Sequence, residues 1–385
     1  MIRQFLLLSF FLVLGSCASA EDRYCEAGSF VFDARYDGGD LDGCKLKSDG
    51  SIELTFRPED YKVDDDFSWF SFHVAASQPG MLKAQLKFPK TRARFLPKIS
   101  NDGLTWSTLP EDARDTSKNG KNMDIEVAVD EKGVWISAQE LLTQSYYDDW
   151  LEELAAHNEV TVAVLGESKE QRPVHFAKTA NKSEVIFLLG RQHPGEVPGA
   201  LAMRRFVDEI LGDSDLARRF RERFTVIIMP LINPDGVANG HTRHNSGRTD
   251  LNRDWGPFKQ PETRAIAALL AGIDKLEMQP RLMLDFHATR VTETMVFYTQ
   301  DGADVTNPAN FATNWLDNAK TRLPHYEFKH DPRPVSGLDN TKNYFFERYG
   351  IPSITYEIGD EANREEVLEH TPVFAEEMMR TLLGT

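Results

Sequence analysis

The segment with the most chemical content is residues 190–196, in which a histidine and a glutamate stand three positions apart. It follows an apolar run, residues 185–189, that is typical of a buried strand, and it precedes apolar residues with helical spacing. His193 and Glu196 are therefore expected on a strand-to-helix turn. Imidazole nitrogen and carboxylate oxygen are zinc ligands, and three protein ligands with one open position make a catalytic zinc site. The pair alone is a weak signal, because a glutamate in the first turn of a helix is also favourable without any metal.

Four further segments place polar residues at the ends of apolar runs. Asn-Pro-Asp-Gly follows residues 224–232, and Asp-Leu-Asn-Arg-Asp-Trp closes residues 247–255. Two more runs end in a histidine, His287, and in a glutamate, Glu357. An open α/β sheet builds its site where strands end, so these residues are expected to converge.

Together these segments resemble the zinc carboxypeptidase family, the metallocarboxypeptidases of the funnelin type. The His-Pro-Gly-Glu, Asn-Pro-Asp-Gly-Val and Asp-Leu-Asn-Arg-x-Trp forms are most similar to the cytosolic-carboxypeptidase subfamily. The resemblance covers roughly residues 150–385, and a β-rich segment upstream also fits that subfamily. It implies a zinc-dependent enzyme that hydrolyses the C-terminal amide bond of a peptide.

The resemblance implies one zinc ion per chain, held by His193, Glu196 and His287. It also implies that Asp250 accepts the other ring N–H of the first histidine, the usual arrangement around a metal-bound imidazole. Without the motif, His287 would be interpreted as a core histidine and Asp250 as a turn carboxylate. The spacing of His241 and His244 offers a rival ligand pair, but both lie in a loop rich in Gly and Asn.

Glu357 is the expected general base, which takes a proton from the attacking water and passes it to the leaving amine. We expect its neighbours Asp360 and Glu361 to be solvated. Arg243 is expected to stabilise the oxyanion of the tetrahedral intermediate, with Arg248 as its rival.

Substrate binding is expected from Asn252 and Arg253, because a guanidinium fork binds a terminal carboxylate bidentately. Lys342 stands where the cytosolic-carboxypeptidase pattern has a basic residue that binds an acidic C-terminal side chain of the substrate. The alternative interpretation of Lys342 is an ordinary solvated lysine.

The sequence departs from the family pattern at a tyrosine that pancreatic-type members carry some twenty residues before the base. Residues 331–338 contain none, so no tyrosine is assigned.

The N-terminus is interpreted as a targeting segment. Arg3 precedes apolar residues 5–14, a stretch too short to span a bilayer and typical of a signal peptide. Cleavage after Ala20 would remove residues 1–20, whereas a lipobox-like sequence would remove residues 1–16 and leave a lipid on Cys17; we favour the lipobox. A plain membrane anchor is a third alternative.

The protein is therefore expected in the periplasm or cell envelope. The chain has 385 residues and three cysteines, so Cys25 and Cys44 remain as a pair that an oxidising compartment permits to form a disulfide. The formal net charge of −16 disfavours nucleic acid as a partner, and a membrane is expected only through a lipid on Cys17. The expected partner is a peptide substrate, and the sequence carries no signal for an oligomeric state.

The expected fold class is α/β. Short alternating strands separated by turn signals predict an antiparallel β-sandwich over residues 21–145, interpreted as a scaffold or a guide for substrate. Strands alternating with helices, such as residues 261–276 and 363–382, predict a mixed-sheet α/β/α zinc carboxypeptidase domain over residues 146–385.

Two alternative functions remain. One is an N-acyl amino acid deacylase of the succinylglutamate desuccinylase or aspartoacylase type, which shares the fold and often lacks the tyrosine. The other is a non-catalytic binding protein on the same scaffold. The Asn-Pro-Asp-Gly motif and the β-rich segment favour the peptidase, and the joint presence of both histidines and both glutamates argues against a non-catalytic protein.

Overall fold

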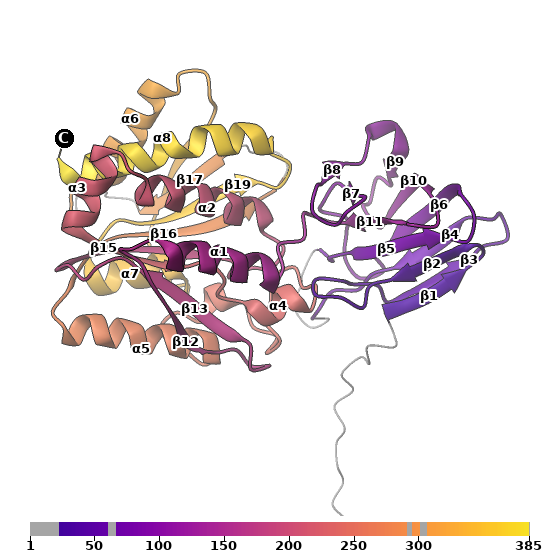
Figure 1. The fold of residues 1–385 in the computed structure, drawn as a ribbon, viewed down its shortest axis with the longest axis horizontal. Coiled ribbons are helices and arrows are strands. Elements are labelled where there is room, and N and C mark those ends of the chain that lie inside the picture. The colour runs from indigo at the N-terminus through magenta and orange to yellow at the C-terminus, as the bar shows by residue number, and fades with distance from the viewer. Residues whose placement is uncertain (1–22, 61–66, 291–294, 301–305, 385) are drawn as a thin grey trace, which may run out of the picture.

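The computed structural model describes residues 23–60, 67–290, 295–300 and 306–384. Two parts lie side by side: a pair of β-sheets whose strands fall between Tyr24 and Ser137, called the sandwich below, and a helix-covered sheet whose elements fall between Gln144 and Leu383, called the α/β part (Figure 1). The expected signal peptide and Cys17 lie outside the described residues. No helix among the described residues is long and apolar enough to cross a membrane.

The sandwich consists of a six-stranded sheet, in the order β1-β2-β5-β11-β7-β8, and a five-stranded sheet, in the order β3-β4-β6-β10-β9. Their pairs are antiparallel except β4 with β6, which is parallel. The strands are β1 (Tyr24–Ala27), β2 (Phe30–Asp33), β3 (Gly43–Leu46), β4 (Ile52–Thr55), β5 (Ser71–Ala76), β6 (Gly80–Lys87), β7 (Lys98–Ser100), β8 (Ser107–Thr108), β9 (Arg114–Thr116), β10 (Asn122–Val129) and β11 (Val134–Ser137), with a short 3-10 helix, η2 (Glu111–Ala113), before β9.

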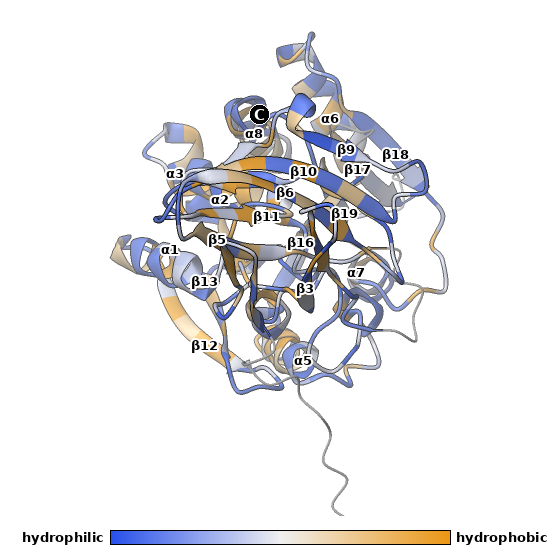
Figure 2. Ribbon diagram, turned by 90° about the vertical axis from the view of Figure 1, so that its right-hand side faces the viewer, coloured by the Kyte–Doolittle hydropathy of each residue, from blue (hydrophilic) through white to orange (hydrophobic). Residues whose placement is uncertain are grey.

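The alternation of residue types along these strands produces the core of the sandwich. Successive side chains of a strand point to opposite faces. In β10, Met123, Ile125, Val127 and Val129 are buried while the intervening residues are exposed, and the strand is banded blue and orange in Figure 2.

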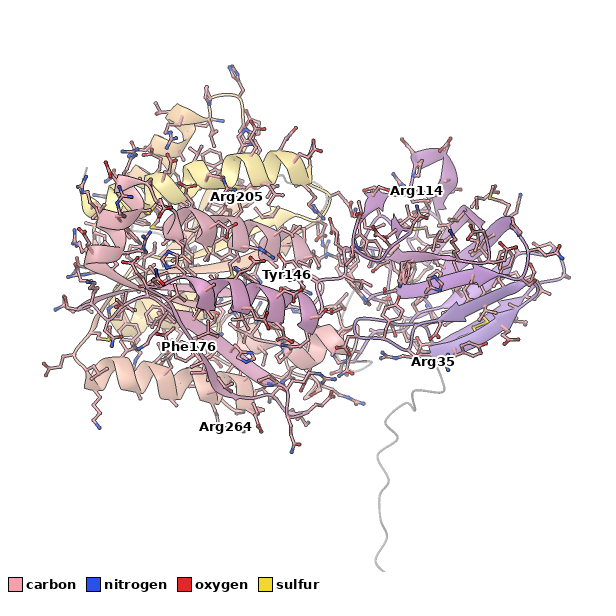
Figure 3. All side chains as sticks on the ribbon, viewed as in Figure 1. Arg35, Arg114, Tyr146, Phe176, Arg205 and Arg264 are labelled. Atoms are coloured by element: carbon pink, nitrogen blue, oxygen red, sulfur yellow. A yellow bond between two sulfur atoms is a disulfide. The ribbon has the colours of Figure 1, made fainter. Side chains whose placement is uncertain are left out.

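A disulfide joins Cys25 of β1 to Cys44 of β3, as expected from the cysteine count (Figure 3). The two half-cystines are 19 positions apart and belong to different sheets, so the bond connects the two layers of the sandwich. Closing such a loop restricts the unfolded chain and thereby stabilises the fold.

The α/β part is built on an eight-stranded sheet in the order β12-β13-β15-β14-β16-β19-β17-β18. The central strands β15, β14, β16 and β19 are mutually parallel, whereas β12, β13 and β17 introduce antiparallel pairs. The strands are β12 (Thr161–Glu167), β13 (Pro173–Lys178), β14 (Glu184–Gly190), β15 (Phe224–Met229), β16 (Gln279–Thr289), β17 (Met295–Gln300), β18 (Lys329–Arg333) and β19 (Ser353–Gly359).

Helices cover both faces of this sheet, which confirms the expected α/β/α layering. In β14, Ile186 and Leu188 face one core, whereas Val185, Phe187 and Leu189 face another. Helices α2, α3, α6 and α8 contribute to the first core, and α5 and α7 contribute to the second. The helices are α1 (Gln144–Ala156), α2 (Val197–Leu211), α3 (Asp215–Arg223), α4 (Pro234–Ala238), α5 (Pro261–Lys275), α6 (Phe311–Arg322), α7 (Thr341–Tyr349) and α8 (Arg364–Leu383), with a 3-10 turn, η3 (Leu251–Arg253).

Candidate active site

Three adjacent parallel strands, β14, β16 and β19, bring their carboxyl ends to one edge of the sheet. His193 and Glu196 lie on the turn between β14 and α2, His287 lies on β16, and Glu357 lies on β19. His287 and Glu357 are direct neighbours in the β16–β19 register. Backbone pairing therefore sets His287 beside Glu357, and the turn after β14 brings His193 and Glu196 to the same edge.

Both imidazoles turn their Nδ1 atoms toward the carboxylate of Glu196. His193 Nδ1 lies 3.0 Å from Glu196 Oε1, and His287 Nδ1 lies 2.6 Å from Glu196 Oε2. Glu196 is the N-cap residue of α2, but its side chain accepts no hydrogen bond from that helix. Glu196 therefore does not act as a side-chain cap of α2, which was the alternative to metal binding.

Close packing of α2 holds this triad together. A Cβ on Gly199 would lie 2.4 Å from the backbone oxygen of His287, so any other residue would push the helix away from β16. The helix that begins at Glu196 is thus in direct contact with the strand that carries His287. His193, Glu196 and His287 are 4 %, 6 % and 2 % exposed, so solvent does little to screen their charges.

The second nitrogen of each imidazole is bound to a carboxylate. His193 Nε2 lies 2.9 Å from Asp250 Oδ1, as the resemblance implied. His287 Nε2 lies 2.9 Å from Asp285 Oδ2, and the Asn252 amide lies 3.3 Å from the same nitrogen. Such carboxylates fix the tautomer that leaves Nδ1 as the ligand atom and raise its basicity.

These residues fit a zinc ion. The ligand atoms of His193, Glu196 and His287 all lie within 4.8 Å of one another, and no other group of described residues offers such a cluster. Two imidazoles and one carboxylate are the ligand set of a catalytic zinc, which leaves a position open for water or substrate. His241, from the rival ligand pair, instead directs its Nδ1 to the backbone oxygen of His244 at 3.0 Å.

The electrostatics of the triad agree with a cation site. Burial disfavours the charged form of Glu196, but the two imidazoles outweigh it and hold the pKa of Glu196 well below its ordinary value. Burial likewise opposes protonation of His287, yet Asp285 and Glu196 raise its pKa well above the usual range. The carboxylates around the two imidazoles thus favour a cation between His193, Glu196 and His287.

A cavity of about 680 Å³ opens in front of the triad. Glu196 and Glu357 are its acidic lining residues, and every other charged side chain that lines it among the described residues is basic or a histidine. The basic ones are Arg94, Arg243, Arg253, Arg290, Arg333 and Lys342. Arg94, Arg243 and Arg333 form ion pairs with Asp360, Asp250 and Asp331, which offset part of this positive charge.

Glu357 is partly buried and faces this cavity. Burial, together with the nearby carboxylate of Glu196, raises the pKa of Glu357 to about 7. A carboxyl group whose pKa is close to neutral can both accept and donate a proton near physiological pH.

The arginines expected at the site differ in their placement. Arg243 lines the cavity and its guanidinium binds Asp250, at 2.8 Å from Nε and 2.6 Å from Nη2. Its rival Arg248 is exposed and does not line the cavity. Arg253 lines the cavity, and its Nη1 donates to the backbone oxygen of Asn252 at 2.6 Å.

Asn252 and Lys342 are both buried at the cavity wall. The side-chain oxygen of Asn252 accepts from the backbone N–H and the hydroxyl of Thr341, each at 2.9 Å. Lys342 is 8 % exposed, and its Nζ donates to the backbone oxygen of Thr299 at 3.4 Å. The interpretation of Lys342 as an ordinary solvated lysine is therefore wrong.

The expectation that Asp360 and Glu361 are solvated is also wrong. Asp360 is fully buried and accepts from Arg94 of the sandwich, at 2.7 Å from Nε. Glu361 accepts from the Leu96 backbone N–H at 3.0 Å and forms an ion pair with Lys98. Both carboxylates bind residues of the sandwich and so help to join the sandwich to the α/β part. These partners lie far away in sequence, so local sequence patterns do not predict them.

Three further residues lie at the candidate site and were not predicted from the sequence. Asp285 precedes His287 by two positions in a strand, and this period-two spacing was a usable signal that both face the same side. Arg94 reaches the cavity from the sandwich, and its Nη2 donates to the backbone oxygen of Ala288 at 3.1 Å. Tyr298 of β17 also lines the cavity, with the Arg333 guanidinium 4.0 Å from its ring centroid.

Comparison with known proteins shows similarity to zinc carboxypeptidases. The model of the zinc carboxypeptidase family (Peptidase_M14) matches residues 147–257, a span that includes six of the predicted site residues: His193, Glu196, Arg243, Asp250, Asn252 and Arg253. Cytosolic carboxypeptidase 6 of Mus musculus is 25% identical over 292 residues, which cover 68% of this chain and 52% of the mouse protein. The chain thus spans about half the length of that relative.

A bacterial relative and two solved structures match over most of their length. Uncharacterized protein ZMO1242 of Zymomonas mobilis is 22% identical over 339 residues, covering 84% of this chain and 86% of the relative. A metallo-carboxypeptidase from Burkholderia cenocepacia superposes with a TM-score of 0.76 at 19% identity, covering 93% of this chain and 98% of that one. One from Pseudomonas aeruginosa gives 0.74 at 18% identity, covering 91% and 97%. The resemblance to the zinc carboxypeptidase family is confirmed, and so is the fold.

Graded loss of zinc is the first prediction. His193→Ala should abolish tight zinc binding, because it removes one of three ligands. Asp285→Asn should weaken binding by about 10- to 100-fold, because it removes a carboxylate that orients His287. His241→Ala is the matched control and should bind zinc normally. Competition with a zinc chelator measures the three affinities, and normal affinity in the His193 variant would contradict the ligand assignment.

Proposed function

We propose that this protein is a zinc-dependent carboxypeptidase that hydrolyses the C-terminal amide bond of peptides. The observation that carries the proposal is the register of β16 and β19, which sets Glu357 beside His287 at the floor of a cavity with basic walls. The sequence and structural similarities to metallocarboxypeptidases support the same reaction class.

The residues of the chain suggest a division of labour. A zinc ion held by His193, Glu196 and His287 would act as a Lewis acid toward water and the scissile carbonyl group. Glu357 would accept the proton of the attacking water and deliver it to the leaving amine, a role that its pKa of about 7 suits. Arg243 would donate hydrogen bonds to the oxyanion, which requires it to exchange part of its contact with Asp250.

Selection of a chain terminus would come from Asn252 and Arg253. The guanidinium fork of Arg253 matches the planar carboxylate of a terminal residue. An internal peptide bond offers no such group, so the cavity would discriminate against internal segments.

We further propose a preference for acidic C-terminal residues. Lys342 is buried at the cavity wall, and Arg290 and Arg333 add positive charge to the same cavity. An acidic side chain brought there would replace water around these cations, whereas a lysine side chain would be repelled. An ammonium is a point charge, so it should attract Glu and Asp with little selectivity between them.

The protein is also proposed to be exported to the periplasm or cell envelope, with a membrane contact only through a lipid on Cys17. The apolar stretch after Arg3 supports export, and the disulfide between Cys25 and Cys44 is suited to an oxidising compartment. The expected partner is a peptide and not a nucleic acid, because the formal net charge is −16.

Loss of turnover without loss of metal is expected for Glu357→Gln. The amide is nearly isosteric but cannot accept a proton, and general-base contributions are typically about 10²- to 10⁴-fold. Steady-state hydrolysis of a blocked dipeptide and elemental analysis of the same sample measure both quantities. Glu347→Gln, an exposed position on α7, is the control for the substitution itself. Near-normal kcat in the Glu357 variant would place the general base elsewhere.

Substrate preference is tested with peptides that differ only in their last residue. Peptides ending in Glu or Asp should show higher kcat/KM than those ending in Leu or Lys. Lys342→Met should lower kcat/KM for the Glu peptide by about 10-fold or more, because a charged hydrogen bond contributes about 1.5–3 kcal/mol, and should change the Leu peptide little. Lys275→Met, exposed on α5, is the matched control. Equal values for Glu, Leu and Lys peptides in the wild type would contradict the preference.

Export is tested by intact-mass analysis of the mature protein. The mass should correspond either to a lipid on Cys17 or to a chain that begins at Glu21. Cys25 and Cys44 should resist alkylation until a reductant is added. A retained Met1 would contradict export, and free thiols would contradict the disulfide.

A further inference from the structure

The carboxylate of Glu59, in the sandwich, receives three consecutive backbone N–H groups of the α/β part. Its Oε1 accepts from Thr242 at 3.2 Å, from Arg243 at 2.7 Å and from His244 at 3.0 Å. Its Oε2 accepts from the Thr242 hydroxyl at 2.9 Å. One side chain therefore binds a whole loop, residues 242–244, that lies about half the chain away in sequence.

This arrangement requires a particular backbone conformation, because successive N–H groups converge on one point only when the backbone curves into a concave anion site. Burial opposes ionisation of Glu59, but the nearby His241 and the amide donors outweigh it, so the pKa of Glu59 lies below its ordinary value. The charged carboxylate and the curved loop stabilise each other. Without the carboxylate, three backbone N–H groups would lose their acceptor, and nothing would hold residues 242–244 in the curved conformation.

The loop is connected to the metal ligands on its other side. The Thr242 backbone oxygen accepts from the Gly195 N–H at 3.0 Å, next to Glu196. A Cβ on Gly195 would lie 3.2 Å from that oxygen and 3.4 Å from the ring of Phe95, so the ligand turn, the loop and the sandwich meet here in close contact. The loop cannot shift far without disturbing the turn that carries His193 and Glu196.

The same loop carries Arg243, whose guanidinium binds Asp250 at the edge of the cavity. Asp250 in turn binds His193. A continuous chain of hydrogen bonds therefore leads from Glu59 through the loop to Arg243 and then to a metal ligand. The position of the Arg243 backbone therefore limits the positions that its guanidinium can reach.

We propose that Glu59 is a positioning residue that sets Arg243 for the reaction, so that the sandwich completes the active site. This rests on the proposed function, in which Arg243 stabilises the oxyanion. A preorganised donor is effective because it is already aimed where charge develops, and a donor on a relaxed loop must be reoriented during the reaction. Glu59 should therefore affect kcat far more than KM.

Other contacts between the two parts provide a matched control. Glu361 also joins the sandwich to the α/β part, through Lys98 and the Leu96 backbone N–H, and it is not among the described residues that line the cavity. Glu361→Gln removes one interface carboxylate of the same kind. It should leave kcat and KM close to their wild-type values.

Glu59→Gln should lower kcat about 10-fold with KM changed less than about threefold, since loss of an entire oxyanion donor costs about 10²- to 10³-fold. Zinc content should stay normal. Glu59→Asp keeps the charge on a shorter stem and should recover part of kcat. Wild-type kcat in Glu59→Gln, or an equal loss in Glu361→Gln, would overturn the proposal.

A double-mutant cycle separates positioning from general loss of structure. In an Arg243→Ala background, Glu59→Gln should lower kcat less than about twofold, because the group it positions is absent. An effect equal to that in the wild-type background would show that Glu59 does not act through Arg243, and the proposal would fail.

Hydrogen exchange of the full chain tests the contact independently of turnover. Backbone amides in a peptide covering residues 241–245 should exchange faster in Glu59→Gln than in the wild type, and unchanged exchange would overturn the proposal. Should the wild type hydrolyse no peptide, the proposed function fails, while the exchange measurement still decides whether Glu59 holds the loop.

Discussion

Parallel pairing of β14, β16 and β19 is the constraint on which the site depends. The register sets His287 beside Glu357, and the turn after β14 brings His193 and Glu196 to the same edge. Side chains alternate along a strand, so a slip of one residue would turn His287 and Asp285 to the opposite face. The apolar residues between these positions resist such a slip, because they face the helices on both sides of the sheet. The two hydrophobic cores that stabilise the fold thus also fix the strand register that places the site residues.

Burial of so many polar groups is tolerated because nearly every one has a partner. Behind His287, Asp285 accepts from the Gln192 amide at 2.7 Å, and the Gln192 oxygen accepts from Trp255 Nε1 at 2.8 Å. The same amide donates to the Thr341 hydroxyl at 2.8 Å, and Thr341 donates to Asn252. Asp285 Oδ1 is the exception in this network and has no hydrogen-bond partner. The other groups have few alternative arrangements, because each displaced group would lose a buried hydrogen bond. Rigidity of the ligand set follows from the network and not from the zinc alone.

The sequence was most informative where function depends on local spacing. Apolar runs predicted the central strands, and the residues that close them, His193, His287 and Glu357, converge as expected. It failed where a partner lies far along the chain. Asp360 and Glu361 look like surface carboxylates beside Glu357, and only the folded chain shows them bound to the sandwich. A rule for strand periodicity would have found Asp285, but no local rule would have found residues of the sandwich at the site.

The sandwich is attached to the α/β part at the points that carry the chemistry. Arg94 binds Asp360 and the backbone oxygen of Ala288, so it contacts the segments immediately after Glu357 and His287. Glu59 binds the loop that carries Arg243. The Arg94 contact lies where the β16–β19 pairing ends, at Thr289 and Gly359, and the Glu59 contact lies on a loop outside the sheet. A parallel sheet can align its ligands but cannot restrain the loops beyond its edge, and the sandwich supplies that restraint from outside.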